Sequence, residues 1–225
     1  MKDTYRFKDT ICTIVCDDDL MRKAKDLIYD ARQIVEAKVA DDEFFKVTYY
    51  PYEPRGDDHP LIQRMCEASI LSDVGPMAGV AGAVAVYAVE GLVEAGAKKA
   101  IVENGGDIAF YSEEPVPIEL FADHPTLKDV AFMMDSDRIT GVCSSSAKIG
   151  PSVSLGDSNV CTVFSDNVIL ADCCATALGN MVKDERSLSD SLERIGSIEG
   201  VKGCLACIGD KVAMYGDVPA MVHLK

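Results

Sequence analysis

The spacing of apolar residues along the chain predicts five helices. The longest lies at residues 18–40, where Leu20, Ala24 and Leu27 begin an apolar series that continues at helical spacing. Three aspartates at residues 17–19 supply a cap and negative charge at the start of this helix. The other four helices are expected at residues 60–71, 77–96, 170–182 and 187–198.

Short runs of β-branched and aromatic residues, bounded by Gly, Pro, Asp and Ser, predict ten strands. They are expected at residues 11–16, 44–50, 100–104, 108–111, 118–123, 130–135, 139–144, 160–165, 203–209 and 211–216. No repeat, low-complexity tract or linker interrupts these elements. The simplest organisation is therefore one α+β domain over residues 1–225, with mixed or antiparallel sheets packed against helices.

One apolar stretch imitates a membrane span. Residues 74–89 carry no charge, but their number falls short of the ~20 residues that cross a bilayer. Glu90 and Glu94 follow directly. We therefore expect a helix buried inside the domain and no membrane partner.

The charge and the cysteine content narrow the environment and the partners. A formal net charge of −15 repels phosphate backbones, so we do not expect a nucleic acid partner. The first ten residues contain no apolar segment of a secretory signal. Nine cysteines, an odd number, are typical of a reducing compartment in which thiols stay free. These features predict a cytoplasmic protein, and a homo-oligomer is compatible with them.

The cysteines and histidines do not form the usual zinc or hydrolase patterns. Cys204 and Cys207 lie three apart in a predicted strand, so their side chains should point to opposite faces. Cys173 and Cys174 diverge by about 100° on a helix. We therefore expect no zinc site and buried free thiols. None of the three histidines stands beside a serine or cysteine in an elbow motif, which leaves a hydrolase triad without support.

Asp172 and Thr176 are the first candidates for metal binding. Four residues apart on a helix, they place a carboxylate and a hydroxyl on one face, one turn apart. Such hard oxygen ligands suit Mg²⁺, which takes few protein ligands and leaves other positions to water and phosphates. The alternative is that Asp172 caps the helix and Thr176 only faces solvent. The spacing alone favours this simpler alternative.

The segment "ENGGDIAF" is the first candidate for ligand binding. Gly105 and Gly106 permit positive φ angles and close approach of a ligand to the backbone. Asn104 and Asp107 can bind a heterocycle or simply hold the turn, and a decorated hairpin is the alternative. Two further segments have the same two interpretations. Small residues near the start of the apolar helix could admit a phosphate or allow tight helix packing. The long small-residue loop at 144–159 could be functional or disordered.

Three segments in this order resemble the ApbE-type superfamily, the FAD:protein FMN transferases. They are "GVAGAVAVYAVEGLVEAGAKKAIVENGGDI", "TGVCSSS" and "CTVFSDNVILADCCATALGN". The resemblance covers roughly residues 76–180. The whole chain is most similar to a cytoplasmic branch of that superfamily whose function is unknown. The resemblance implies an ApbE-like domain that uses Mg²⁺ and FAD or a related flavin nucleotide.

The resemblance also implies roles for individual residues. Asp172, Thr176 and the backbone carbonyl of Ala81 would bind Mg²⁺. The flavin-nucleotide cleft would be lined by the turn and by part of the "TGVCSSS" segment, namely Asn104, Gly105, Gly106, Asp107, Gly141, Ser144 and Ser145. The expected ligand is therefore a small-molecule nucleotide.

Two departures from the superfamily pattern alter the expected chemistry. Gly82 stands where the superfamily has a lysine, and its His-x-x-Asp-Pro segment has no counterpart here. Asp157 could replace the missing base, but an exposed aspartate with a pKa near ~4 is a poor base at neutral pH. Two classes stay open: a Mg²⁺-dependent enzyme acting on a flavin nucleotide or similar phosphoanhydride, and a non-catalytic protein that keeps the cleft. Fast FMN transfer to a threonine is not expected.

Overall fold

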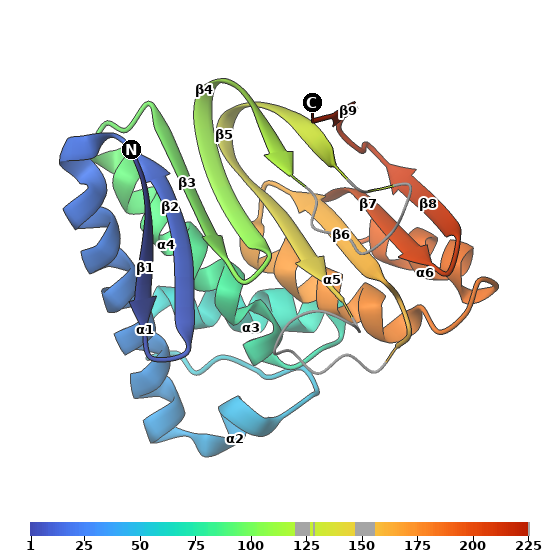
Figure 1. Ribbon diagram of the computed structural model, residues 1–225. Coiled ribbons are helices and arrows are strands. Elements are labelled where there is room, and N and C mark those ends of the chain that lie inside the picture. The colour runs from blue at the N-terminus through green and yellow to red at the C-terminus, as the bar shows by residue number, and fades with distance from the viewer. Residues whose placement is uncertain (120–126, 128, 147–155, 225) are drawn as a thin grey trace.

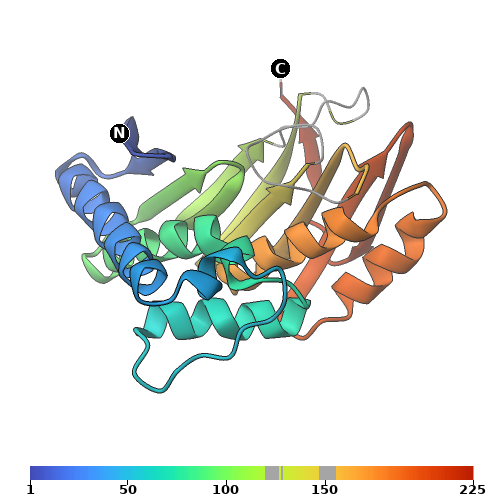
Figure 2. The same cartoon turned by 90° about the horizontal axis from the view of Figure 1, so that it is seen from below.

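One antiparallel sheet organises the protein, with the helices gathered on one of its faces (Figures 1 and 2). The computed structural model describes residues 1–119, 127, 129–146 and 156–224. Within these residues, nine strands form a single sheet in which every pairing is antiparallel. The predicted α+β class is confirmed, and the sheet is antiparallel rather than mixed.

The strands follow one another across the sheet in chain order. They are β1 (Lys2–Phe7), β2 (Thr10–Cys16), β3 (Lys99–Asn104), β4 (Asp107–Glu119), β5 (Val130–Ser145), β6 (Val160–Ser165), β7 (Val201–Ile208) and β8 (Lys211–Gly216), while β9 (Met221–His223) pairs with β5. The helices are α1 (Met21–Asp41), α2 (Glu43–Val47), α3 (Pro60–Ser72), α4 (Val80–Glu94), α5 (Val168–Met181) and α6 (Ser187–Gly196). Short 3-10 turns at Asp18–Leu20 and Pro76–Gly79 lead into α1 and α4.

Two apolar cores lie on opposite faces of the sheet. The larger core fills the space between the sheet and the helices and contains Ile14, Ile28 and Leu92. The smaller core lies on the other face, where Phe132 and Phe164 meet edge to face with ring centroids 4.8 Å apart. The central strands are therefore buried on both sides, as their nearly continuous apolar sequences require.

The most apolar helix is used inside the larger core. Among the described residues, Pro76–Glu94 is the one segment with the length and composition of a membrane span, and 56% of its most apolar window is buried. It packs on β3 and β4 and against α1 and α5 (Figure 2). Most of this helix is therefore enclosed by the protein, and its partly exposed side carries Glu90, which pairs with Arg64.

The predicted strand at residues 44–50 is wrong, because this segment begins with α2. The Asp42 side chain accepts a hydrogen bond from the Phe44 N–H and so caps a helical turn. Only Phe45 is buried in this turn, whereas Phe44 and Val47 face outward. The run of aromatic and β-branched residues resembles a strand in composition, but the cap and one buried anchor decide its conformation.

Other strand predictions were incomplete. β1 was missed because its residues alternate between exposed and half-buried, without an apolar signature. The separate strands expected at 130–135 and 139–144 are one long strand, β5. Of the expected strand 118–123, residues 118 and 119 belong to β4 and the rest lies outside the described residues. Ser144, expected both at the end of a strand and at the start of a loop, lies in β5, and Ser145, expected in the loop, ends that strand. Residues 147–155 of the loop lie outside the described residues.

Candidate functional site

Two glycines allow the helices α4 and α5 and the strand β5 to pack closely against one another on the helix face of the sheet. A Cβ atom on Gly82, in the first turn of α4, would lie 2.9 Å from the Cβ of Asp172 in α5. A Cβ on Gly141 of β5 would lie 2.8 Å from the Cα of Val168 at the start of α5. Both distances are shorter than real contacts, so the absence of side chains lets α5 lie directly against α4 and β5. Gly141, expected beside the cleft, therefore has a packing contact with α5.

Two buried carboxylates come together where these elements meet. Asp172 lies in the first half of α5, and its Oδ2 accepts the Gly82 N–H at 2.7 Å. Asp107 begins β4 and pairs with Cys143 of β5, so both side chains lie on the helix face of the sheet. Both carboxylates are buried, and within the described residues the Oδ1 of Asp107 has no hydrogen-bond partner.

Burial makes both carboxylates hard to ionise together. Burial, followed by the neighbouring charge of Asp172, raises the pKa of Asp107 well above its usual range. Burial raises the pKa of Asp172 to about 7, against the hydrogen bonds from the Gly82 and Ala81 backbones and from Asp107, which favour the charged form. Two like charges in a low-dielectric interior repel each other, so the pair holds a proton or a cation.

The glycine turn has the conformation that its sequence predicts. Gly105 has a φ of 69° and Gly106 a φ of 104°. The Gly106 N–H donates to Glu103 Oε1 at 3.0 Å, and the Ser144 N–H donates to the Gly106 carbonyl at 3.2 Å. Glu103 was not predicted to take part in the turn, although a side chain three residues before Gly106 can reach the backbone N–H of that glycine.

The carbonyl of Ala81 lies within reach of the same turn. The Asn104 Nδ2 donates to the Ala81 oxygen at 3.2 Å, joining the end of β3 to the first turn of α4. The sequence-predicted residues Ala81, Asn104, Asp107 and Asp172 are therefore brought together. Thr176 lies one turn after Asp172 on α5 and is half-buried, as helix geometry requires.

The two serines of β5 point to opposite faces of the sheet. Ser145 is buried and lies on the helix face, because it is two residues after Cys143. Ser144 lies on the other face, and its Oγ is 2.9 Å from the Thr162 Oγ1 of β6. The strand thus brings Ser145, and not the Ser144 hydroxyl, to the side of the carboxylates. The Cys143 thiol, missed in the sequence, lies beside Asp107 and favours its charged form.

Asp157 lies away from the carboxylate pair. Its backbone N–H donates to the Val182 carbonyl at 3.0 Å, directly after the end of α5, and its side chain is exposed. Ten residues of helix separate Val182 from Asp172, which corresponds to about 15 Å along the axis. The structure therefore does not bring the proposed base beside the expected metal ligands.

The donor set fits a hard cation of the Mg²⁺ type. The described part of the chain contains no group of three or more His, Cys, Asp or Glu arranged around one point. Two carboxylates, a hydroxyl and a backbone carbonyl are hard oxygen donors, and Mg²⁺ usually completes such a set with water and phosphates. The observation that supports this fit is the Oδ1 of Asp107, which has no hydrogen-bond partner among the residues that the structure describes.

The cysteine pair behaves as strand geometry predicts. Cys204 faces the larger core, where its Sγ lies 3.4 Å from the Leu192 carbonyl, and Cys207 belongs to the smaller core on the other face. All nine cysteines are buried free thiols. Burial raises the pKa of Cys204 to about 11 and that of Cys12 to about 12, so these thiols stay protonated at neutral pH.

The fold is that of the ApbE flavin transferases. The chain is similar to the flavinyl transferase ApbE of Pseudomonas stutzeri in its apo form, with a TM-score of 0.59 and 13% identity over 96% of this chain and 93% of that chain. It is also similar to the flavin transferase ApbE of Vibrio cholerae, with a TM-score of 0.59 and 11% identity over 96% of each chain. At this identity the likeness shows the fold alone.

Sequence comparison places the chain in a family. The family model described as AbpE bacteria matches residues 6–194, and the protein belongs to this family. It is 42% identical to a UPF0280 protein of Methanocella arvoryzae, over 97% of this chain and 90% of that protein. It is 43% identical to a UPF0280 protein of Methanothrix thermoacetophila, over 97% and 93% of the two chains. The superfamily predicted from three motifs is confirmed.

Proposed function

We propose that this protein binds a hard divalent cation such as Mg²⁺ at Asp107 and Asp172, together with the phosphates of a flavin nucleotide such as FAD. The observation that carries the proposal is the pair of buried carboxylates, one of which has an oxygen without a partner among the described residues. Buried charges of one sign are otherwise costly, and a bound cation offsets this cost.

The residues of the chain have separate tasks in this proposal. Asp107 and Asp172 would hold the cation, and the Gly82 N–H fixes the Asp172 carboxylate through Oδ2. Thr176 and the carbonyl of Ala81 are the further oxygens within the same region. A bound Mg²⁺ neutralises charge on the phosphoryl oxygens that it contacts.

The glycine turn would admit the nucleotide. Gly105 and Gly106 have no Cβ and adopt positive φ angles, so a ligand can approach their backbone closely. Flavin is proposed on the motif resemblance, and the named activity of the ApbE structures agrees with it. The nine free cysteines support a cytoplasmic protein, and the net charge of −15 disfavours a nucleic acid partner. No membrane partner is proposed, because most of the apolar helix is buried in the protein.

Binding without fast transfer is favoured over FMN transfer to a threonine. Among the described residues, His59 caps α3 by accepting the Leu61 N–H at 3.1 Å, and His223 lies in β9. Asp157 is at the far end of α5. No described imidazole or exposed carboxylate is therefore placed to act as a base beside the pair, and general-base help is typically worth about 10²–10⁴-fold in rate.

Metal and nucleotide titrations test the proposal. We expect Mg²⁺ or Mn²⁺ to bind the wild type, measured by calorimetry, and to strengthen FAD binding, measured by flavin fluorescence. Asp172→Ala should lose both effects, whereas the matched control Asp157→Ala should keep them. Equal cation affinity in wild type and Asp172→Ala would remove the proposed metal site.

The transfer chemistry has a separate assay. The protein is incubated with FAD, Mg²⁺ and an acceptor protein of an ApbE transferase, and covalent flavin is measured by in-gel fluorescence. We expect labelling at least about 100-fold slower than by an authentic transferase. Labelling at the rate of the transferase would show that another residue of this chain supplies the base.

A further inference from the structure

A short segment on the helix side of the protein exposes four large apolar side chains. The aromatic patch consists of Phe44 and Val47 of α2 and of Tyr49 and Tyr50, which follow it. Their exposed fractions are 61%, 62%, 70% and 77%. Single exposed apolar residues are normal on protein surfaces, but four within seven residues of chain are a concentration of the kind that often marks an interaction site.

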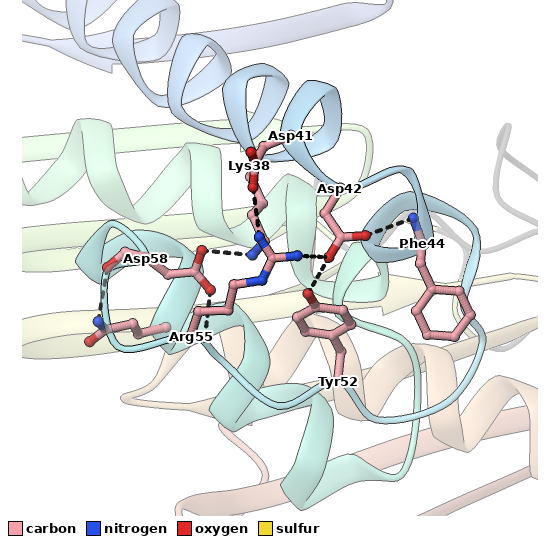
Figure 3. Close-up of polar contacts among 8 residues, drawn as sticks. Lys38, Asp41, Asp42, Phe44, Tyr52, Arg55 and Asp58 are labelled. Carbon is pink, nitrogen blue, oxygen red and sulfur yellow. Dashed lines mark hydrogen bonds and ion pairs between the residues drawn. The ribbon is translucent and has the colours of Figure 1, made fainter.

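The chain that follows the patch is held against α1 by a buried ion pair. The Lys38 Nζ lies 2.6 Å from Asp58 Oδ1, and only 4% and 8% of the two side chains are exposed (Figure 3). The ammonium also lies 5.2 Å from the ring centroid of Tyr52 and 5.6 Å from that of Phe45. Both rings pack over the Lys38 ammonium: Phe45 lies between Phe44 and Val47 in the chain, and Tyr52 follows the patch.

A second group of contacts fixes the start of α2. Arg55 bridges Asp41 at 2.7 Å and Asp42 at 2.6 Å, and the Tyr52 hydroxyl donates to Asp42 at 2.5 Å (Figure 3). The other oxygen of Asp42 caps α2 through the Phe44 N–H. Asp42 thus links Tyr52 and Arg55 to the first turn of α2, the helix that carries Phe44.

The end of the patch is held by backbone packing. A Cβ on Gly75 would lie 2.0 Å from the Thr48 carbonyl oxygen and 3.1 Å from the Cα of Tyr49. The Thr48 Oγ1 accepts the Tyr50 N–H at 3.1 Å. The four exposed side chains are therefore presented by a fixed backbone, and such preorganisation reduces the entropy lost on binding.

We propose that the aromatic patch is the contact between two copies of this chain in a two-fold dimer. The area fits this occupant: three aromatic side chains of about 150–250 Å² each, roughly 70% exposed, offer on the order of 400 Å². A standard interface buries about 800 Å² on each partner, with an apolar centre and a polar rim. The patch supplies such a centre.

The charges around the patch favour a second copy over other partners. Glu43 and Lys46 are exposed on α2, and neither makes an ion pair within the described part of the chain. Two α2 helices that meet antiparallel across a two-fold axis place Glu43 of one copy near Lys46 of the other, as an isologous interface requires. Nucleic acid supplies no cationic group to pair with Glu43, whereas a second copy of this chain supplies Lys46.

The net charge gives the dimer an unusual salt dependence. Two bodies of charge −15 repel each other at low ionic strength, and this repulsion is screened when the Debye length falls from about 30 Å to about 8 Å. The apolar contact itself does not weaken with moderate salt. Dimerisation through the patch should therefore strengthen as salt rises from about 10 mM to about 150 mM.

Sedimentation of the full chain over a range of concentrations tests the proposal. We expect a dimer in the wild type and at least about 100-fold weaker dimerisation in Tyr50→Glu and in Phe44→Glu, because a two-fold axis counts each substitution twice. Tyr50→Ser serves as a milder variant if the charged ones fold poorly, as judged by circular dichroism. Met214→Glu, an exposed apolar position on β8, is the matched control and should dimerise like the wild type.

Three outcomes overturn the proposal. The first is a wild type that stays monomeric up to about 100 μM, and the second is a set of folded patch variants that dimerise as tightly as the wild type. The third is a dimer that Met214→Glu dissociates and the patch variants do not. A wild-type dimer that is lost in the patch variants, retained in Met214→Glu and strengthened by salt supports it. Cation binding at Asp172 is unaffected by any of these results, since the patch shares no residue with that site.

Discussion

Replacing Asp172 by asparagine removes one negative charge from the buried carboxylate pair and keeps its shape. The amide oxygen can still accept the Gly82 N–H, which Asp172 Oδ2 accepts at 2.7 Å. The new amide group can also donate toward Asp107. The substitution therefore tests the charge of the pair and leaves its packing in place.

The size of the expected stability change follows from the pKa of Asp172 in the metal-free protein. Burial raises the pKa of Asp172 from 3.8 to about 7. A group whose folded pKa lies above its unfolded pKa contributes stability below the unfolded value and loses it as the pH rises through the folded value. Three pKa units correspond to about 4 kcal/mol, so we expect the wild type to lose roughly 2–4 kcal/mol of unfolding free energy between pH 4 and 7 from this group.

Urea unfolding in a chelator, measured from about pH 5 to about pH 8, isolates this contribution. The difference between Asp172→Asn and wild type should grow with pH, and the variant should be the more stable protein at pH 8. Saturating Mg²⁺ should then stabilise the wild type by about 3 kcal/mol at 100 times its Kd and leave the variant unchanged. Parallel stability curves for wild type, Asp172→Asn and the control Asp157→Asn would refute the reasoning.

Three further predictions concern packing, the ion pair and the turn. Gly82→Ala should lower the unfolding free energy by about 1–3 kcal/mol and weaken cation binding, because its methyl group meets the carboxylate site. Gly91→Ala on the same helix meets only the flexible end of a leucine and should cost less in the same urea titration. Lys38→Met should destabilise by about 3–5 kcal/mol, since it leaves Asp58 buried without its cation, and Asp58→Asn added to it should restore part of this loss in thermal melts. Gly106→Val should abolish FAD binding in a fluorescence titration while costing about 1–3 kcal/mol of stability, because the φ of 104° is strained for valine; full-strength binding would make the turn purely structural.

Much of the candidate site could be predicted because its parts are local. A helix places residues four apart on one face, so Asp172 and Thr176 share a face of α5 wherever that helix lies. Two consecutive glycines predict positive φ angles, and both Gly105 and Gly106 adopt them. The opposite orientation of Cys204 and Cys207 likewise follows from the two-residue period of a strand.

Other features depend on pairing and could not be predicted. Asp107 meets Asp172 because β4 pairs with β5 in a register that places Asp107 opposite Cys143, beneath α5. The same register turns the Ser144 hydroxyl toward Thr162, away from the carboxylates. The packing of residues 156 and 157 against the end of α5 separates Asp157 from the site. None of these relations is encoded in the spacing of residues within one segment.

The sequence by itself determined the helices with long apolar periodicity, the glycine turn and the placement of a carboxylate and a hydroxyl on one helical face. These are set by backbone geometry over a few residues. The tertiary structure decided that residues 43–47 form a helix, through the Asp42 cap and one buried aromatic ring. It also decided that two distant aspartates share one buried site, because desolvation and charge repulsion arise only when β4, α4 and α5 are packed together.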